Sequence, residues 1–126
     1  MTKKNKFDTI ETFIGQNTVL NGNISTEKTI RIDGKMTGNI ENSAGVIIGD
    51  AASLKGDINS NYVLVSGTVE GNITATEYVE LFNKSKIIGN IQTKMISISE
   101  GAVFEGRSLM LNNGENSTVN TEKEAD

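Results

Sequence analysis

The stretch 68-TVEGNITATEYVELFNKSKIIGNIQT-93 contains the tripeptide Gly-Asn-Ile twice, and related phrases occur on both sides of it. Six glycines open these phrases: Gly22, Gly38, Gly56, Gly71, Gly89 and Gly106. Their separations are 16, 18, 15, 18 and 17 residues. A short phrase that returns at a nearly constant period indicates stacked structural repeats.

Each repeat also carries two aliphatic residues spaced i, i+2, as in Val79-Glu80-Leu81. This spacing is typical of a short strand with one buried face. The other pairs are Ile30/Ile32, Val46/Ile48, Val63/Val65 and Ile96/Ile98. A third apolar side chain precedes each corner glycine, as Leu20, Met36, Leu54, Val69, Ile87/Ile88 and Phe104. We interpret Gly-Asn-Ile as two corner residues followed by one core residue, because glycine readily adopts the positive φ of a tight corner.

The sequence therefore predicts an all-β protein: a single compact parallel β-helix of about six coils, with three short strands per coil, over residues 12–111. Residues 1–11 are expected to form a flexible N-terminal tail. Residues 112–126 are polar and acidic, and we expect them to be a disordered C-terminal tail. The corner lengths alternate and depart from a six-residue rhythm, so the period leaves the hand of the coil open.

Composition excludes several classes of function. The chain has no histidine and no cysteine, which removes thiolate and imidazole catalysis and the common zinc sites. We predict no enzymatic activity, no metal and no cofactor. The net charge is −4, and the sequence has no stripe of basic residues, so nucleic acid is not an expected partner. No phosphate-binding Gly-x-x-x-x-Gly-Lys-Ser/Thr motif occurs, and no apolar run is long enough to span a bilayer. We expect a cytoplasmic protein.

Four short motifs follow one another on this period: Thr12-x-Ile14-Gly15, Arg31-Ile32-Asp33-Gly34, Val79-Glu80-Leu81 and Gly101-Ala102-x-Phe104-x-Gly106. In this order they resemble the bactofilin family, over about residues 12–110. The resemblance implies a right-handed parallel β-helix and a bacterial cytoskeletal protein. It also implies filaments that form without nucleotide and are non-polar, because N-terminal ends meet N-terminal ends and C-terminal ends meet C-terminal ends.

The ends of the predicted rod also favour self-association on physical grounds. An uncapped solenoid exposes unpaired backbone groups and an aliphatic cross-section at each end. The candidate contacts at the first coil (the N-end) are Phe13, Ile14, Val19 and Leu20, and those at the last coil (the C-end) are Phe104, Leu109 and Leu111. For Phe104 a second interpretation stays open, in which it fills the tapering end of the core.

The N-terminal residues suggest a peripheral membrane contact. Lys3, Lys4, Lys6 and Phe7 combine positive charge with one apolar ring, and each lysine near anionic lipid contributes about 1 kcal/mol. The alternative is a solvated tail that leads into the first coil.

These observations together predict a bacterial cytoskeletal scaffold, cytoplasmic or peripheral at the inner face of the membrane. It would assemble end to end with itself and position partner proteins in cell shape, cell-wall modification or motility. The alternative is a non-polymerising β-helical binding module that recognises a protein or a glycan through its flat faces.

Overall fold

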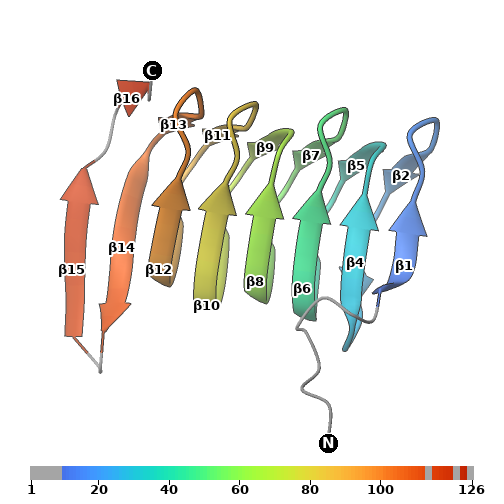
Figure 1. The fold of residues 1–126 in the computed structure, drawn as a ribbon. Coiled ribbons are helices and arrows are strands. Elements are labelled where there is room, and N and C mark those ends of the chain that lie inside the picture. The colour runs from blue at the N-terminus through green and yellow to red at the C-terminus, as the bar shows by residue number, and fades with distance from the viewer. Residues whose placement is uncertain (1–9, 113–114, 121–122, 125–126) are drawn as a thin grey trace, which may run out of the picture.

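The computed structural model describes residues 10–112, 115–120 and 123–124, and every regular element in these ranges is a β-strand. The chain winds as a right-handed parallel β-helix of six coils. In Figure 1 most of the front strands point upward and the short strands lie behind them, while the chain advances from right to left. The predicted fold class is confirmed.

The strands form two sheets that run along the rod. The nine-stranded sheet consists of β1 (Ile10–Ile14), β3 (Ile24–Ser25), β4 (Thr29–Ile32), β6 (Ile40–Ile48), β8 (Ile58–Val65), β10 (Ile73–Leu81), β12 (Ile91–Ile98), β14 (Arg107–Asn112) and β15 (Glu115–Asn120). The seven-stranded sheet consists of β2 (Val19–Asn21), β5 (Lys35–Thr37), β7 (Ser53–Lys55), β9 (Thr68–Glu70), β11 (Lys86–Ile88), β13 (Val103–Glu105) and β16 (Lys123–Glu124).

Each coil has three sides, and in β6, β8, β10 and β12 one bent strand makes two of them, whereas β3 and β4 make them separately in the second coil. In β10 the pairing register with both neighbours shifts between Ala75 and Tyr78, because an irregularity there turns the strand. We call the strand halves aligned with Ile73–Ala75 side 1 and those aligned with Tyr78–Leu81 side 2. Side 3 consists of the short strands of the seven-stranded sheet.

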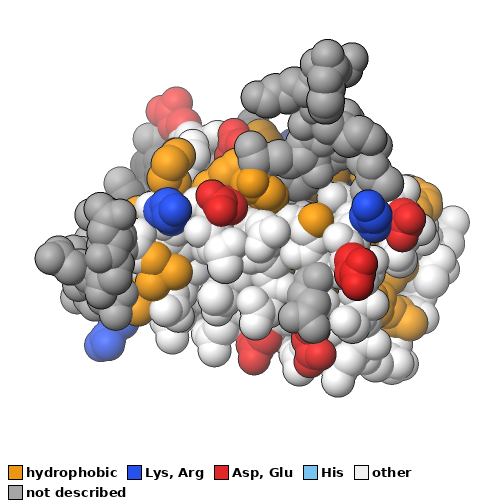
Figure 2. Space-filling model, turned by 90° about the horizontal axis from the view of Figure 1, so that it is seen from below, with side chains coloured by type: hydrophobic (Ala, Val, Ile, Leu, Met, Phe, Trp, Pro, Cys, Tyr) orange, Lys and Arg blue, Asp and Glu red, His pale blue; other side chains and the backbone are white. Residues whose placement is uncertain are grey.

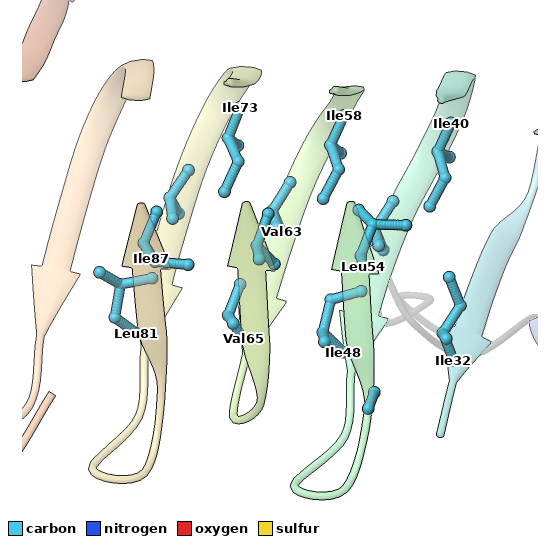
Figure 3. Packing of buried hydrophobic residues seen from close by; sticks show 14 of the residues in the cluster. Ile32, Ile40, Ile48, Leu54, Ile58, Val63, Val65, Ile73, Leu81 and Ile87 are labelled. Atoms are coloured by element: carbon cyan, nitrogen blue, oxygen red, sulfur yellow. The ribbon is translucent and has the colours of Figure 1, made fainter. Parts of the chain in front are cut away.

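The core consists of aliphatic ladders in which each coil supplies one rung. Parallel pairing aligns Ile58 with Ile73 and Val65 with Leu81. Figure 3 shows Ile40, Ile58 and Ile73 in one row and Ile48, Val65 and Leu81 in another. These six side chains are at most 1% exposed, and burying one such side chain stabilises the fold by about 1.5–3 kcal/mol. The i, i+2 aliphatic pairs are therefore rungs of the core in coils two to five.

The corner glycines stack directly on one another. Gly71 has φ +149°, a region that side chains rarely adopt. A Cβ at this position would lie against the carbonyl oxygen of Gly56 and 2.6 Å from its carbonyl carbon. Gly22 opens the column with φ +136° and has no atom within 4 Å of such a Cβ. Glycine is thus required at Gly71 by both backbone conformation and the neighbouring coil.

The second residue of the phrase forms a hydrogen-bond ladder along the outside of the rod. The backbone N–H of Asn72 donates to Asp57 Oδ1 at 3.0 Å, and Asn72 Oδ1 accepts from the backbone N–H of Asn90 at 3.1 Å. The same bond joins Asn23 to Asn39 and Asn39 to Asp57, each at 2.8 Å, and Asn90 to Arg107 at 3.2 Å. Asp57 replaces asparagine without breaking the ladder, because both residues supply Oδ1. Arg107 ends it, since a guanidinium accepts no hydrogen bond.

Candidate assembly site at the two ends of the rod

The N-end consists of strand edges that lack a neighbour on their outer side within the part of the chain that the structure describes. There β1 pairs only with β4, β2 only with β5, and β3 only with β6. Unpaired edges present rows of N–H and C=O groups that can pair with another chain. Among residues 10–112, the N-end therefore offers three strand edges that could pair with another chain.

The structure brings the four predicted N-end residues together on this first coil. Phe13 is 62% and Val19 67% exposed, while Ile14 is 7% exposed and closes an internal ladder. Leu20 is half-buried against the core. The end surface also includes Ile10, which is 43% exposed and which was assigned to the flexible tail.

The predicted membrane contacts Lys3, Lys4, Lys6 and Phe7 lie outside the described residues. The start of the folded domain differs slightly from its predicted position. Strand β1 begins at Ile10, two residues before the expected boundary, because Ile10 aligns with Thr29 of the next coil.

At the C-end, the structure places Phe104 in the core and not on the end surface. Phe104 is 1% exposed and pairs with Lys123 of β16 on its outer side. It ends the ladder that contains Ile87, which agrees with the second interpretation of this residue. Leu109 and Leu111 lie half-buried on β14, whose outer edge is paired with β15. A contact made directly by Phe104 would require β16 to detach from β13.

The C-terminal segment differs from the expected disordered tail at two places. Residues Glu115–Asn120 pair antiparallel with β14, and Lys123–Glu124 pair antiparallel with β13. Backbone pairing satisfies the N–H and C=O groups of these edges and needs no apolar side chains, so the polar composition of the segment does not prevent it. The C-end is consequently covered along sides 1 and 3.

Side 2 of the last coil stays open, and the sequence gives little sign of it. Strand β14 pairs with β12 only at Ile91–Thr93, which leaves Met95–Ile98 without a neighbour among the described residues. Met95 is 61% exposed, and Ile96 is only half-buried although its equivalent Val79 is fully buried. In sequence Ile96 and Ile98 look like every other core pair. Their exposure arises because β14 runs on past the bend without turning over side 2.

The described residues carry few charged contacts. Two ion pairs, Arg31–Asp33 at 3.1 Å and Lys84–Asp50 at 3.9 Å, lie on the sides of the rod. Within the described ranges there is no group of three or more acidic, histidine or cysteine side chains placed to hold a metal ion. In the same ranges no helix has the length and apolar character needed to cross a membrane.

The match to known sequences agrees with this architecture. Residues 12–109 match the sequence profile of the bactofilins, described as polymer-forming cytoskeletal proteins. The chain belongs to the bactofilin family. It is 33% identical to bactofilin BacO of Myxococcus xanthus over 95 residues, which cover 75% of each protein. It is 30% identical to bactofilin BacP of the same organism over 96 residues, or 76% of this chain and 40% of BacP.

A solved bactofilin has the same fold. The Thermus thermophilus protein, determined by cryo-electron microscopy as double helical filaments, superposes with a TM-score of 0.70 at 24% identity. The match covers 80% of this chain and all of that one. This bactofilin is thus a β-helical member of a polymer-forming cytoskeletal family, and the resemblance predicted from the four motifs is confirmed.

Proposed function

We propose that this bactofilin is a bacterial cytoskeletal scaffold whose rods join end to end, like end to like end, into non-polar filaments that need no nucleotide. The observation that carries the proposal is the pair of open ends. Among the described residues, the N-end presents three strand edges without an outer neighbour, beside exposed Phe13 and Val19, and the C-end presents the edge Met95–Ile98.

Strand direction supports contacts between like ends. All strands of side 2 run parallel within the rod, so joining two C-ends places their β12 edges antiparallel about a two-fold axis. Such a contact is isologous and closes on itself. Antiparallel pairing is also slightly more stable per residue than parallel pairing. The same geometry applies to two β1 edges at the N-end.

The size of the contact explains why apolar side chains are needed there. A rod end about 20 Å across offers roughly 400 Å² per partner, about half of a standard interface. Pairing of backbone edges alone would leave such a contact weak. Burial of Phe13 and Val19 at one junction and of Met95 at the other supplies the additional stabilisation.

Blocking one end at a time tests the proposal and its symmetry. We expect Phe13→Glu to remove the N-end contact and leave dimers joined through their C-ends, and Met95→Glu to leave dimers joined through their N-ends. The double variant should be a monomer. The matched control is Asn59→Glu, which adds the same charge to an exposed site on side 1 and should form filaments.

Analytical ultracentrifugation and negative-stain electron microscopy give the outcome. If each single variant is a monomer, the rods join head to tail and the like-end assignment is wrong. If the unmodified protein sediments as a small monodisperse species, the protein is a non-polymerising binding module and not a filament.

The filament would act as a scaffold for proteins of cell shape, cell-wall modification or motility at the cytoplasmic face of the membrane. Lys3, Lys4, Lys6 and Phe7 are the proposed membrane contacts. A single tail binds weakly, but a filament presents many tails at once, and multivalency raises the overall affinity. Vesicles containing anionic lipid should co-sediment with filaments of the full chain and not with filaments lacking residues 2–8. Equal co-sedimentation would rule out this anchor.

A further inference from the structure

The last two strands run against the direction of their neighbours. Strand β15 pairs antiparallel with β14, and β16 pairs antiparallel with β13. All other strand pairs of the described residues are parallel. Figure 1 shows β14 pointing down and β15 pointing up beside it. The chain thus lays one strand over side 1 and then one over side 3, like the start of a coil wound in the opposite sense. We call β15 and β16 the C-terminal cap.

This reversed direction is the one that a like-end partner would bring. Two rods that meet at their C-ends are related by a two-fold axis perpendicular to the rod axis. The chain of the partner therefore winds in the opposite sense, and each strand that it lays on this C-end runs antiparallel. A head-to-tail partner would lay parallel strands instead. The C-terminal cap thus occupies its two edges in the same direction as the strands of a second C-end.

The edges beneath the cap carry the predicted C-end contacts. Strand β13 contains Phe104, and β14 contains Leu109 and Leu111. The inner side of β13 is paired with β11 and its outer side with β16, while β14 lies between β12 and β15. A second rod can therefore pair with β13 and β14 only after the cap has detached.

The cap covers two of the three sides of this end. On side 2 the edge Met95–Ile98 has no neighbour among the described residues, and Met95 is 61% exposed. In Figure 2, which views the rod from below, hydrophobic side chains appear toward both ends of the rod, while much of the middle is white. A capped C-end thus offers about a third of the roughly 400 Å² of a rod end, and the other two thirds become available when the cap detaches.

The composition of the cap favours reversible attachment. Its two strands contain one aliphatic residue, Val119, whereas the coils of the rod contribute aliphatic rungs to the core. Backbone hydrogen bonds stabilise an attached strand only slightly, because the detached strand bonds to water instead. Ordering the strand also costs conformational entropy. A second C-end, which brings Met95, Leu109 and Leu111, can therefore displace the cap.

We propose that the C-terminal cap is an intramolecular competitor that limits assembly at the C-end. The inference rests on the proposed end-to-end filament and adds the segment that controls one of its junctions. An attached cap raises the apparent dissociation constant of the C-end junction by the inverse of the fraction of rods whose cap is detached. The N-end edges have no such cover within the described residues. Rods therefore join first through their N-ends, and these pairs join through their C-ends at higher concentration.

Two neighbouring proline substitutions detach the cap. Successive N–H groups of a strand point to opposite edges, so either Ser117 or Thr118 directs its N–H toward β14. Ser117→Pro/Thr118→Pro removes that donor, and the matched control Ser117→Ala/Thr118→Ala keeps it. Both are made in the Phe13→Glu chain, in which only the C-end junction is left. One lost strand hydrogen bond shifts detachment by roughly 2- to 10-fold. We expect the dissociation constant of the C-end dimer, measured by analytical ultracentrifugation, to fall by a similar factor relative to the control.

A disulfide locks the cap in place. The chain has no cysteine, and Val103 and Glu124 are direct partners in the β13–β16 pair, where Cβ atoms lie about 4.5–5.5 Å apart. In Val103→Cys/Glu124→Cys, again in the Phe13→Glu chain, we expect the oxidised protein to dimerise more weakly than the reduced protein. Adding a reductant should restore the dimer.

The outcomes separate failure of the cap from failure of the filament. Equal dissociation constants in the proline and alanine variants would mean that the cap does not compete, and weaker dimers in the proline variant would mean that the cap is part of the junction. Either result overturns the inference and leaves the filament standing. If none of the Phe13→Glu variants dimerises, the C-end contact of the proposed function is wrong and the inference fails with it. Should circular dichroism show that the proline variant does not fold, the disulfide variant decides, and a dissociation constant unchanged by reductant would overturn the inference.

Discussion

Replacing the corner glycine of the fifth coil by alanine tests how closely the coils pack. In Gly71→Ala the new methyl group would meet the backbone carbonyl of Gly56, with the carbonyl carbon 2.6 Å away. Neither group is the flexible end of a side chain, so the two coils must separate locally. Gly22→Ala is the control, because its φ of +136° imposes a similar backbone strain but nothing lies within 4 Å of the added methyl.

The expected magnitudes follow from these two contributions. An alanine held at such a φ costs about 1–3 kcal/mol, and both variants carry this cost. Gly71→Ala adds the cost of forcing an extra methyl into a packed site, about 1–3 kcal/mol. It also strains the hydrogen bond that joins these two coils at the corner, from Gly56 N–H to the Glu70 carbonyl oxygen at 2.9 Å. We therefore expect Gly71→Ala to be less stable than Gly22→Ala by at least about 1–3 kcal/mol.

Urea unfolding followed by circular dichroism, at equal protein concentration, measures this difference. Equal concentration is needed because assembly stabilises the folded state. Gly106→Ala separates the clash from position in the rod, since Gly106 is also near an end but would meet the carbonyl of Gly89. It should resemble Gly71→Ala. Equal losses in Gly22→Ala and Gly106→Ala would show that backbone conformation alone requires glycine, and the stacked-corner explanation would fail.

Two further predictions concern the core and the outer ladder. Phe104→Ala should reduce the free energy of unfolding by about 3–5 kcal/mol, as for other buried phenylalanines, and a change below about 1 kcal/mol in thermal or urea unfolding would contradict its burial. Asn90→Ala should cost about 0.5–1.5 kcal/mol and speed hydrogen exchange at the Arg107 amide, whereas Asn90→Asp should keep the exchange slow because it retains the acceptor. Identical exchange in both variants would mean that the bond does not protect this amide.

The rungs of the core could be predicted from sequence because they depend on local spacing. In a solenoid each buried residue meets the equivalent residue of the next coil, so Val63 meets Val79 and Val65 meets Leu81. Period and alternation then determine burial without knowledge of long-range topology. The same reasoning placed Phe13 and Val19 on the first coil, where both side chains are exposed; their role as contacts stays a prediction.

The C-end could not be predicted in this way. Which residues form this end depends on the path of the chain after the last corner. Strand β14 continues past the bend instead of covering side 2. That path exposes Met95 and partly uncovers Ile96, whereas β16 covers Phe104. Apolar content predicted a disordered tail, but the pairing of Glu115–Asn120 uses backbone groups, on which composition carries no information.

The outer ladder was also not assigned from sequence. Asparagine is common at corners because of its backbone conformation, so the sequence alone does not show that Asn72 and its equivalents also accept a hydrogen bond from the next coil. Only the distance between the side-chain oxygen and the N–H of the following coil identifies the hydrogen bond.

The corner residues Asn39, Asp57, Asn72 and Asn90 each donate one backbone hydrogen bond to the coil before and accept one from the coil after. Coils are therefore interchangeable units of length. Duplicating residues 56–70, which run from one corner glycine to the residue before the next, would preserve each rung, each glycine contact and each ladder bond. Such an insertion would lengthen the rod by about 4.8 Å while leaving both ends unaltered. In the proposed filament, such insertions would therefore lengthen the distance between successive junctions in steps of one coil.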